Sequence, residues 1–194
     1  MKFDTWFPTV IGKSYCPFIS DIQSNYKKII ENYSGDENGF FNYPIHLNKD
    51  FKKLNEWVTA EVNKFGKEHN FAFKYEAKES WIWDYKVGSY QDFHAHAGFT
   101  LSTVFFLEGY TDDTHIFFKN PVEDMKNPMN FLPTNRTSFD PSLFNNFTYG
   151  TVDYPPETGM LLTWRSYIEH RVNPKRNMKK RIVFVYNFDA TDRQ

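Results

Sequence analysis

Cysteine is nearly absent from this sequence, because Cys16 is the only one among 194 residues. A single cysteine excludes an intrachain disulfide and a zinc site built from several thiolates. Proteins of a reducing compartment need no such crosslinks. The cysteine content therefore predicts a cytoplasmic location.

The sequence also lacks a long hydrophobic run and an excess of charge of one sign. No stretch approaches the roughly 20 apolar residues that span a bilayer, and the first residues have no signal-peptide pattern. The formal net charge is -1 and the pI is about 6.6, so no overall field attracts nucleic acid or an anionic membrane. We therefore expect no membrane association, no nucleic-acid partner, and a chain that stays where it is made.

Aromatic residues, by contrast, are abundant and predict an ordered core. They make up 20% of the chain, and hydrophobic residues make up 40%, which is too much for a disordered protein. A length of 194 residues suits one medium domain. We predict a single α+β domain over residues 1–194.

The spacing of apolar residues divides this domain into two regions. Residues 1–70 hold two segments of helical spacing, one after Pro17 and one after Asn48 or Asp50, which form a helical support region. Residues 71–190 change to a period of two, which predicts a core of about eight to ten strands. The helices would cover one sheet or form a dimer contact, so we expect a monomer or a homodimer.

Within the strand region, residues 122–154 are polar and have no clear period. A segment of this length is too long for a passive turn. We predict that it forms a lid loop.

Three histidines in the strand region suggest a metal site. His94 and His96 are two residues apart at a strand, so their side chains point to the same face of a sheet. His170 lies on a later strand, which a rolled sheet could bring opposite the pair. Imidazole suits Fe, Zn, Cu and Ni alike, so these residues alone leave the metal open.

An arginine stands at the head of the apolar strand RIVFVYNF, in which Arg181 is the first residue. A charged side chain there is unfavourable unless it has a partner. The planar guanidinium is the group best suited to hold a carboxylate through two parallel hydrogen bonds. The position therefore indicates a carboxylate ligand.

The order of these parts resembles the 2-oxoglutarate and Fe(II)-dependent oxygenases, including the prolyl hydroxylases, and especially a small group common in phages and marine bacteria. The resemblance covers most of the chain: it runs from WFPT near the start, through Tyr85 and Gly88 before His94-x-His96, to LSTVFFL and IFFKNP. Its more specific half consists of GMLLTWRSYIEHRVNP and RIVFVYNF.

The resemblance implies a double-stranded β-helix, a cupin-like jelly-roll, with two N-terminal helices packed on one sheet. It implies an iron-dependent dioxygenase that uses Fe(II) and 2-oxoglutarate and couples decarboxylation of this small-molecule cosubstrate to hydroxylation of a peptide or small-molecule substrate. A hydroxylase of the prolyl 4-hydroxylase kind is the family-level favourite. By the same resemblance His170 is the distal iron ligand and Arg181 anchors the cosubstrate, in the host cytoplasm if a phage encodes the chain.

Two positions depart from the pattern of the wider superfamily. His96 stands where an aspartate or glutamate ligand is usual, and Asp92, on the same face, could replace a ligand or support one from behind. We favour His94, His96 and His170 and keep the set with Asp92 as an alternative.

The second departure is Val183, which stands where many relatives place a hydroxyl group for the cosubstrate. Tyr85, Tyr90 or Ser102 could supply that hydrogen bond instead. Trp164 is the candidate wall of the substrate pocket, although aromatic residues in strands more often pack in the core.

Two other functions remain compatible with these residues. One is a three-histidine dioxygenase or isomerase of the cupin type that needs no 2-oxoglutarate. The other is a non-catalytic binding or structural module of a phage particle. Arg181 discriminates among them, because only the cosubstrate hypothesis provides it with a partner.

Overall fold

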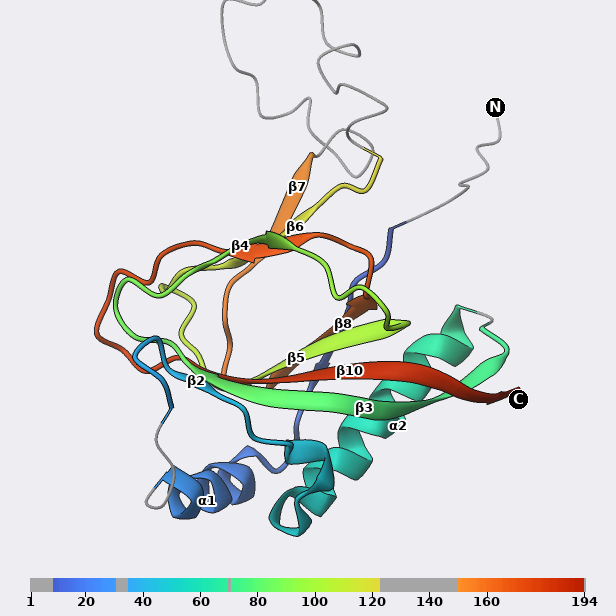
Figure 1. Cartoon of the computed structure of the whole chain (residues 1–194), viewed down its shortest axis with the longest axis horizontal. Coiled ribbons are helices and arrows are strands. Elements are labelled where there is room, and N and C mark those ends of the chain that lie inside the picture. Colours follow the sequence, from blue (N-terminus) through green and yellow to red (C-terminus); the bar gives the residue numbers. More distant parts are fainter. Residues whose placement is uncertain (1–8, 31–34, 70, 123–149, 194) are drawn as a thin grey trace, which may run out of the picture.

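The chain folds into two antiparallel sheets that face each other (Figure 1). The computed structural model describes residues 9–30, 35–69, 71–122 and 150–193. The order in the six-stranded sheet is β1 (Gly12–Tyr15), β8 (Met160–Arg165), β5 (Leu101–Glu108), β10 (Ile182–Arg193), β3 (Phe73–Asp84) and β2 (Phe40–Phe41). The order in the four-stranded sheet is β4 (Gln91–His94), β9 (His170–Val172), β6 (Ile116–Lys119) and β7 (Thr151–Tyr154).

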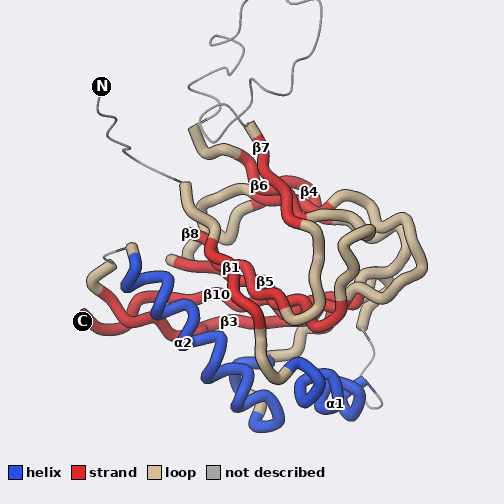
Figure 2. Tube along the Cα trace, turned by 180° about the vertical axis from the view of Figure 1, so that it is seen from behind, coloured by secondary structure: helices blue, strands red, loops and turns tan. Residues whose placement is uncertain are grey.

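Both predicted helices are present, as α1 (Ile19–Ile30) and α2 (Lys52–Glu68), and they lie on the outer side of the six-stranded sheet (Figure 2). The fully buried residues on the apolar face of α2 are Leu54, Val58 and Val62. On the sheet side, the ring of Phe184 packs against Phe51 and Tyr26, with centroids 5.3 and 5.9 Å apart. The helices therefore cover a sheet with their apolar faces, and the predicted α+β class is confirmed.

Residues 1–70 also contribute two strands, which the sequence pattern did not predict. β1 pairs with β8, placing Gly12 opposite Thr163, and β2 pairs with β3, placing Phe40 opposite Trp83. Strands of two to four residues are too short to show a period of two. Of the predicted lid loop, residues 123–149 lie outside the described residues, and its last residues form β7.

The central strand β5 is buried on both faces and separates two cores. Leu101, Phe105 and Leu107 belong to the core beneath the helices. Val104 and Phe106 belong to the core between the two sheets. A strand covered on both faces has no need of polar alternation, which explains the continuous apolar run. No helix in the described part of the chain has the length and apolar character needed to cross a membrane.

Asn48→Ala is expected to lower the free energy of unfolding by about 1 kcal/mol. The side-chain oxygen of Asn48 accepts a hydrogen bond of 2.7 Å from the backbone N–H of Asp50, in the 3-10 turn η2 (Lys49–Phe51) that leads into α2. Alanine would leave this N–H without its partner. Urea unfolding measures the effect, with Lys49→Ala in the same turn as the control. Equal stabilities of the two variants would contradict this capping role.

Candidate metal centre

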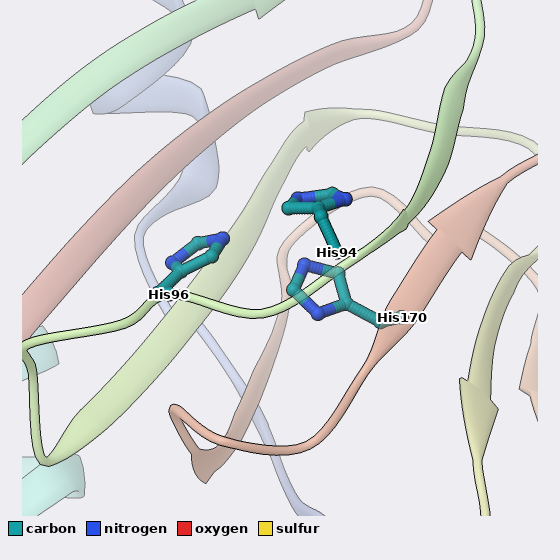
Figure 3. A group of neighbouring side chains, drawn as sticks. All are labelled: His94, His96 and His170. Carbon is teal, nitrogen blue, oxygen red and sulfur yellow. The ribbon is translucent and has the colours of Figure 1, made fainter.

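The three histidines meet where β4 and β9 pair. The antiparallel register places His94 of β4 directly opposite His170 of β9, and His96 follows just beyond the end of β4. One ring nitrogen from each of the three residues lies within 4.8 Å of the others (Figure 3). The strand pairing therefore brings together side chains that are more than 70 residues apart in the sequence.

Each of the three rings uses its Nδ1 atom in a hydrogen bond. The Nδ1 atoms of His94 and His170 lie 2.8 and 3.2 Å from the backbone oxygens of Asp92 and Ile168. The Nδ1 atom of His96 lies 2.5 Å from the side-chain oxygen of Asn187. Because these oxygens can only accept, each Nδ1 carries the proton, and each Nε2 is left with a lone pair for a metal ion.

Burial keeps two of these rings neutral. The pKa of His170 is lowered to about 3, mainly by burial and in addition by the neighbouring His94 and His96. Burial also lowers the pKa of His96, against the opposing effects of the Asn187 hydrogen bond and the negative charge of Glu79. A neutral imidazole is the form that binds a metal ion, so both rings are ready to bind one at neutral pH.

A cavity between the two sheets connects the histidines with Arg181. It contains about 360 Å³ not occupied by protein atoms, part of it open to solvent, and both sheets contribute to its walls. Besides the three histidines and Arg181, the walls include Trp81, Tyr85, Gln91, Val104, Ile116, Trp164, Val183 and Val185. The cavity is thus mostly apolar, with a few polar groups that can orient a ligand.

Arg181 is the cation of this cavity and is only 1% exposed. Its Nη1 atom donates to the backbone oxygen of Thr114, and its guanidinium carbon lies 4.8 Å from the centre of the Tyr85 ring. Its Nε atom has no hydrogen-bond partner, and no carboxylate forms an ion pair with it among the described residues. Burial lowers the pKa of Arg181, and a buried cation in this state is suited to an anionic ligand.

Two other predicted site residues also line the cavity. The hydroxyl of Tyr85 donates to the side-chain oxygen of Gln91 at 2.7 Å, and burial raises the pKa of Tyr85 to about 12. The ring centre of Trp164 lies 4.8 Å from that of His170, and its indole N–H has no partner among the described residues. Tyr85 therefore stands beside Arg181, and Trp164 stands beside the histidines.

Three further predicted residues lie outside the cavity. The side chain of Asp92 is exposed, and this residue supports His94 through its backbone oxygen rather than its carboxylate. The hydroxyl of Ser102 is buried behind His96, 3.1 Å from Nδ1. Tyr90 is 62% exposed, so its expected hydrogen bond to the cosubstrate has no support in this structure. Tyr90 lies just before β4, whose first residue is Gln91.

The sequence patterns did not single out Asn187 and Gln91, which hold His96 and Tyr85. Asn187 is only 2% exposed and lies within residues 182–188 of β10, which are otherwise apolar. A polar residue in a buried strand needs a partner, and that was the available signal. Gln91 carried no comparable signal, because it lies in a polar segment.

The three histidines and the cavity suit the cofactors that the sequence implied. Neutral imidazoles with free Nε2 atoms are suitable ligands for Fe(II), and the unpaired guanidinium is suitable for a dicarboxylate such as 2-oxoglutarate. The fit rests on the hydrogen-bonding state of the rings and on the unpartnered Nε atom of Arg181.

Solved structures of similar fold include several oxygenases. An oxidoreductase of the 2OG-Fe(II) oxygenase family from Burkholderia pseudomallei is 16% identical, with a TM-score of 0.50; the match covers 76% of this chain and 59% of that chain. HygX from Streptomyces hygroscopicus, with nickel and 2-oxoglutarate bound, is 12% identical, with a TM-score of 0.61 over 94% of this chain and 83% of that one. A prolyl-4-hydroxylase from Pseudomonas putida is 11% identical, with a TM-score of 0.59 over 95% and 94%.

These identities are low, so the likeness establishes the fold alone, and it confirms the predicted double-stranded β-helix. No curated protein matches the sequence. Residues 79–187, more than half of the chain, match the family described as "Putative 2OG-Fe(II) oxygenase", and this segment contains the three histidines and Arg181. The chain therefore belongs to the 2OG-Fe(II) oxygenase family, with Fe(II) and 2-oxoglutarate as its cofactors.

Proposed function

We propose that this oxygenase is a hydroxylase in which His94, His96 and His170 hold Fe(II) and Arg181 holds the far carboxylate of 2-oxoglutarate. The observation that carries the proposal is the buried, unpaired guanidinium in the same cavity as the three imidazoles. If the protein were a three-histidine enzyme that needs no 2-oxoglutarate, or a non-catalytic module, this cation would have no anionic partner.

Iron held by the three histidines would supply the oxidation of a substrate C–H bond by O2, coupled to the conversion of 2-oxoglutarate to succinate and CO2. The chain contributes the positioning. Arg181 orients the dicarboxylate, and the face of Tyr85 supports the guanidinium from 4.8 Å. The apolar walls formed by Val104, Val183 and Val185 exclude water from the reacting groups. Trp164 forms the wall next to His170.

A prolyl residue in a peptide is the first candidate substrate, and a small molecule is the second. The resemblance of the motifs to prolyl hydroxylases supports the first, and the fold neighbour from Pseudomonas putida is itself a prolyl-4-hydroxylase. The second has support from HygX, which has been solved with hygromycin B bound. Both substrates undergo the same net reaction, in which one oxygen atom of O2 enters the substrate and the other enters succinate.

Anaerobic titration of the protein with Fe(II) and then 2-oxoglutarate is expected to produce a weak visible charge-transfer band at one cosubstrate per chain. The band requires 2-oxoglutarate to chelate iron that the protein holds. Proline-containing peptides and small molecules can then be screened in air for a mass gain of one oxygen atom together with succinate release. Iron binding without the band would favour the three-histidine enzyme, and no metal binding would favour the non-catalytic module.

A further inference from the structure

The three histidines differ in the group that accepts the hydrogen bond from their Nδ1 atom. His94 and His170 donate to backbone oxygens only two residues away in the sequence. His96 donates instead to a side chain from another strand, Asn187 of β10. The orientation of the His96 ring therefore depends on which amino acid stands at position 187, whereas a backbone oxygen is present whatever the residue.

Asn187 is oriented by partners on both ends of its amide. Its oxygen accepts from the Nδ1 atom of His96 at 2.5 Å and from the hydroxyl of Ser102 at 2.8 Å. Its nitrogen donates to a carboxylate oxygen of Glu79, on β3, at 2.9 Å. Because a carboxylate can only accept, Glu79 turns the amide nitrogen outward and the amide oxygen toward His96.

The hydrogen-bonded chain from Glu79 through Asn187 to His96 ends at a metal ligand. A hydrogen bond to an anion polarises the amide, so its oxygen becomes a stronger acceptor and the His96 ring a stronger electron donor. Three imidazoles bring no negative charge to the metal, whereas the common set of two histidines and one carboxylate brings one. Among the residues that the structure describes, side-chain hydrogen bonds connect the carboxylate of Glu79 to His96 through one amide.

We propose that Glu79 and Asn187 form an outer relay that orients His96 and provides, through one amide, the negative charge that the three-histidine ligand set lacks. The relay rests on the proposed function, because it requires the histidines to hold the metal. Glu79 and Asn187 are positioning residues and do not contact the metal themselves.

Glu79→Gln is expected to raise the dissociation constant for Mn²⁺ by about tenfold, the low end of the effect of outer partners of metal ligands. It should also move the charge-transfer band of the Fe(II) and 2-oxoglutarate complex to higher energy, because the iron becomes less electron-rich. Glu76→Gln is the matched control, since Glu76 is another exposed carboxylate of β3, paired with Lys78 at 3.1 Å. Calorimetry gives the dissociation constants, and anaerobic spectra give the band.

Exchanging the charges of Glu79 and Asn187 distinguishes an electrostatic effect on the metal from simple structural support of the His96 ring. Asn187→Asp alone places a second carboxylate against Glu79, so this variant should bind Mn²⁺ more weakly than the wild type. Combining Asn187→Asp with Glu79→Gln moves the single negative charge one position inward, where it contacts His96 directly. The double variant is expected to bind Mn²⁺ at least as tightly as the wild type.

Two results would overturn the relay. One is a Glu79→Gln variant that matches both the wild type and Glu76→Gln in Mn²⁺ affinity and band position. The other is a double variant that binds Mn²⁺ more weakly than the wild type. A wild-type protein that binds no metal would instead refute the proposed function, so the two failures can be told apart.

Discussion

Arg181→Met is expected to weaken the binding of 2-oxoglutarate by roughly 30- to 3,000-fold while Fe(II) stays bound. The range corresponds to the loss of about 2–5 kcal/mol when one partner of a buried, hydrogen-bonded charge pair is removed. Methionine retains much of the side-chain volume beside Tyr85 and Phe106, against which the guanidinium packs. Anaerobic titration with 2-oxoglutarate, followed through the charge-transfer band, measures the loss.

Two further variants define the origin of this effect. Arg181→Lys keeps the positive charge but removes the planar fork, so its affinity should lie between those of the wild type and Arg181→Met. His170→Ala removes a proposed ligand, so it should lose both Fe(II) binding and the band. An unchanged affinity of Arg181→Met for 2-oxoglutarate would contradict the proposal that Arg181 binds its far carboxylate.

Lys175→Met is expected to lower the free energy of unfolding by about 3–5 kcal/mol at neutral pH. The Nζ atom of Lys175 lies 2.9 Å from a carboxylate oxygen of Asp113, and the two side chains are 2% and 0% exposed. Methionine would leave the carboxylate buried without its cation. Because Thr114, next to Asp113, holds Arg181 through its backbone oxygen, 2-oxoglutarate binding should weaken as well.

The adjacent pair of Lys179 and Asp112 provides a matched control. Its ionic atoms are 2.6 Å apart, but the side chains are 48% and 64% exposed. Lys179→Met should therefore change the stability far less than Lys175→Met does, because the surrounding water screens this pair. Combining Lys175→Met with Asp113→Leu removes both buried charges, so the double variant should be more stable than Lys175→Met alone. Denaturant unfolding of the four proteins tests this, and equal losses from both lysine variants would contradict it.

The local chemistry of the site could be predicted because it depends on neighbouring residues. Two histidines separated by one residue on a strand share a face in any sheet, and an arginine opening an apolar strand needs a partner wherever the strand lies. The two helices were also predictable, since their apolar stripes repeat over several turns. The strands β1 and β2 were not, because their pairing depends on partners more than 40 residues away.

The sequence by itself determined the family resemblance, the fold class and the residue types of a site for a metal and a carboxylate. Only the tertiary structure decided which groups share that site. The register of β4 and β9 sets His170 against His94, and the packing of the two sheets places Arg181 on the same cavity. The tertiary structure also distinguished between similar side chains, because it exposes Tyr90 but buries Tyr85. It places the side chain of Asn187 where it accepts the hydrogen bond from His96. Local periodicity cannot specify such choices, because they depend on contacts between strands far apart in the chain.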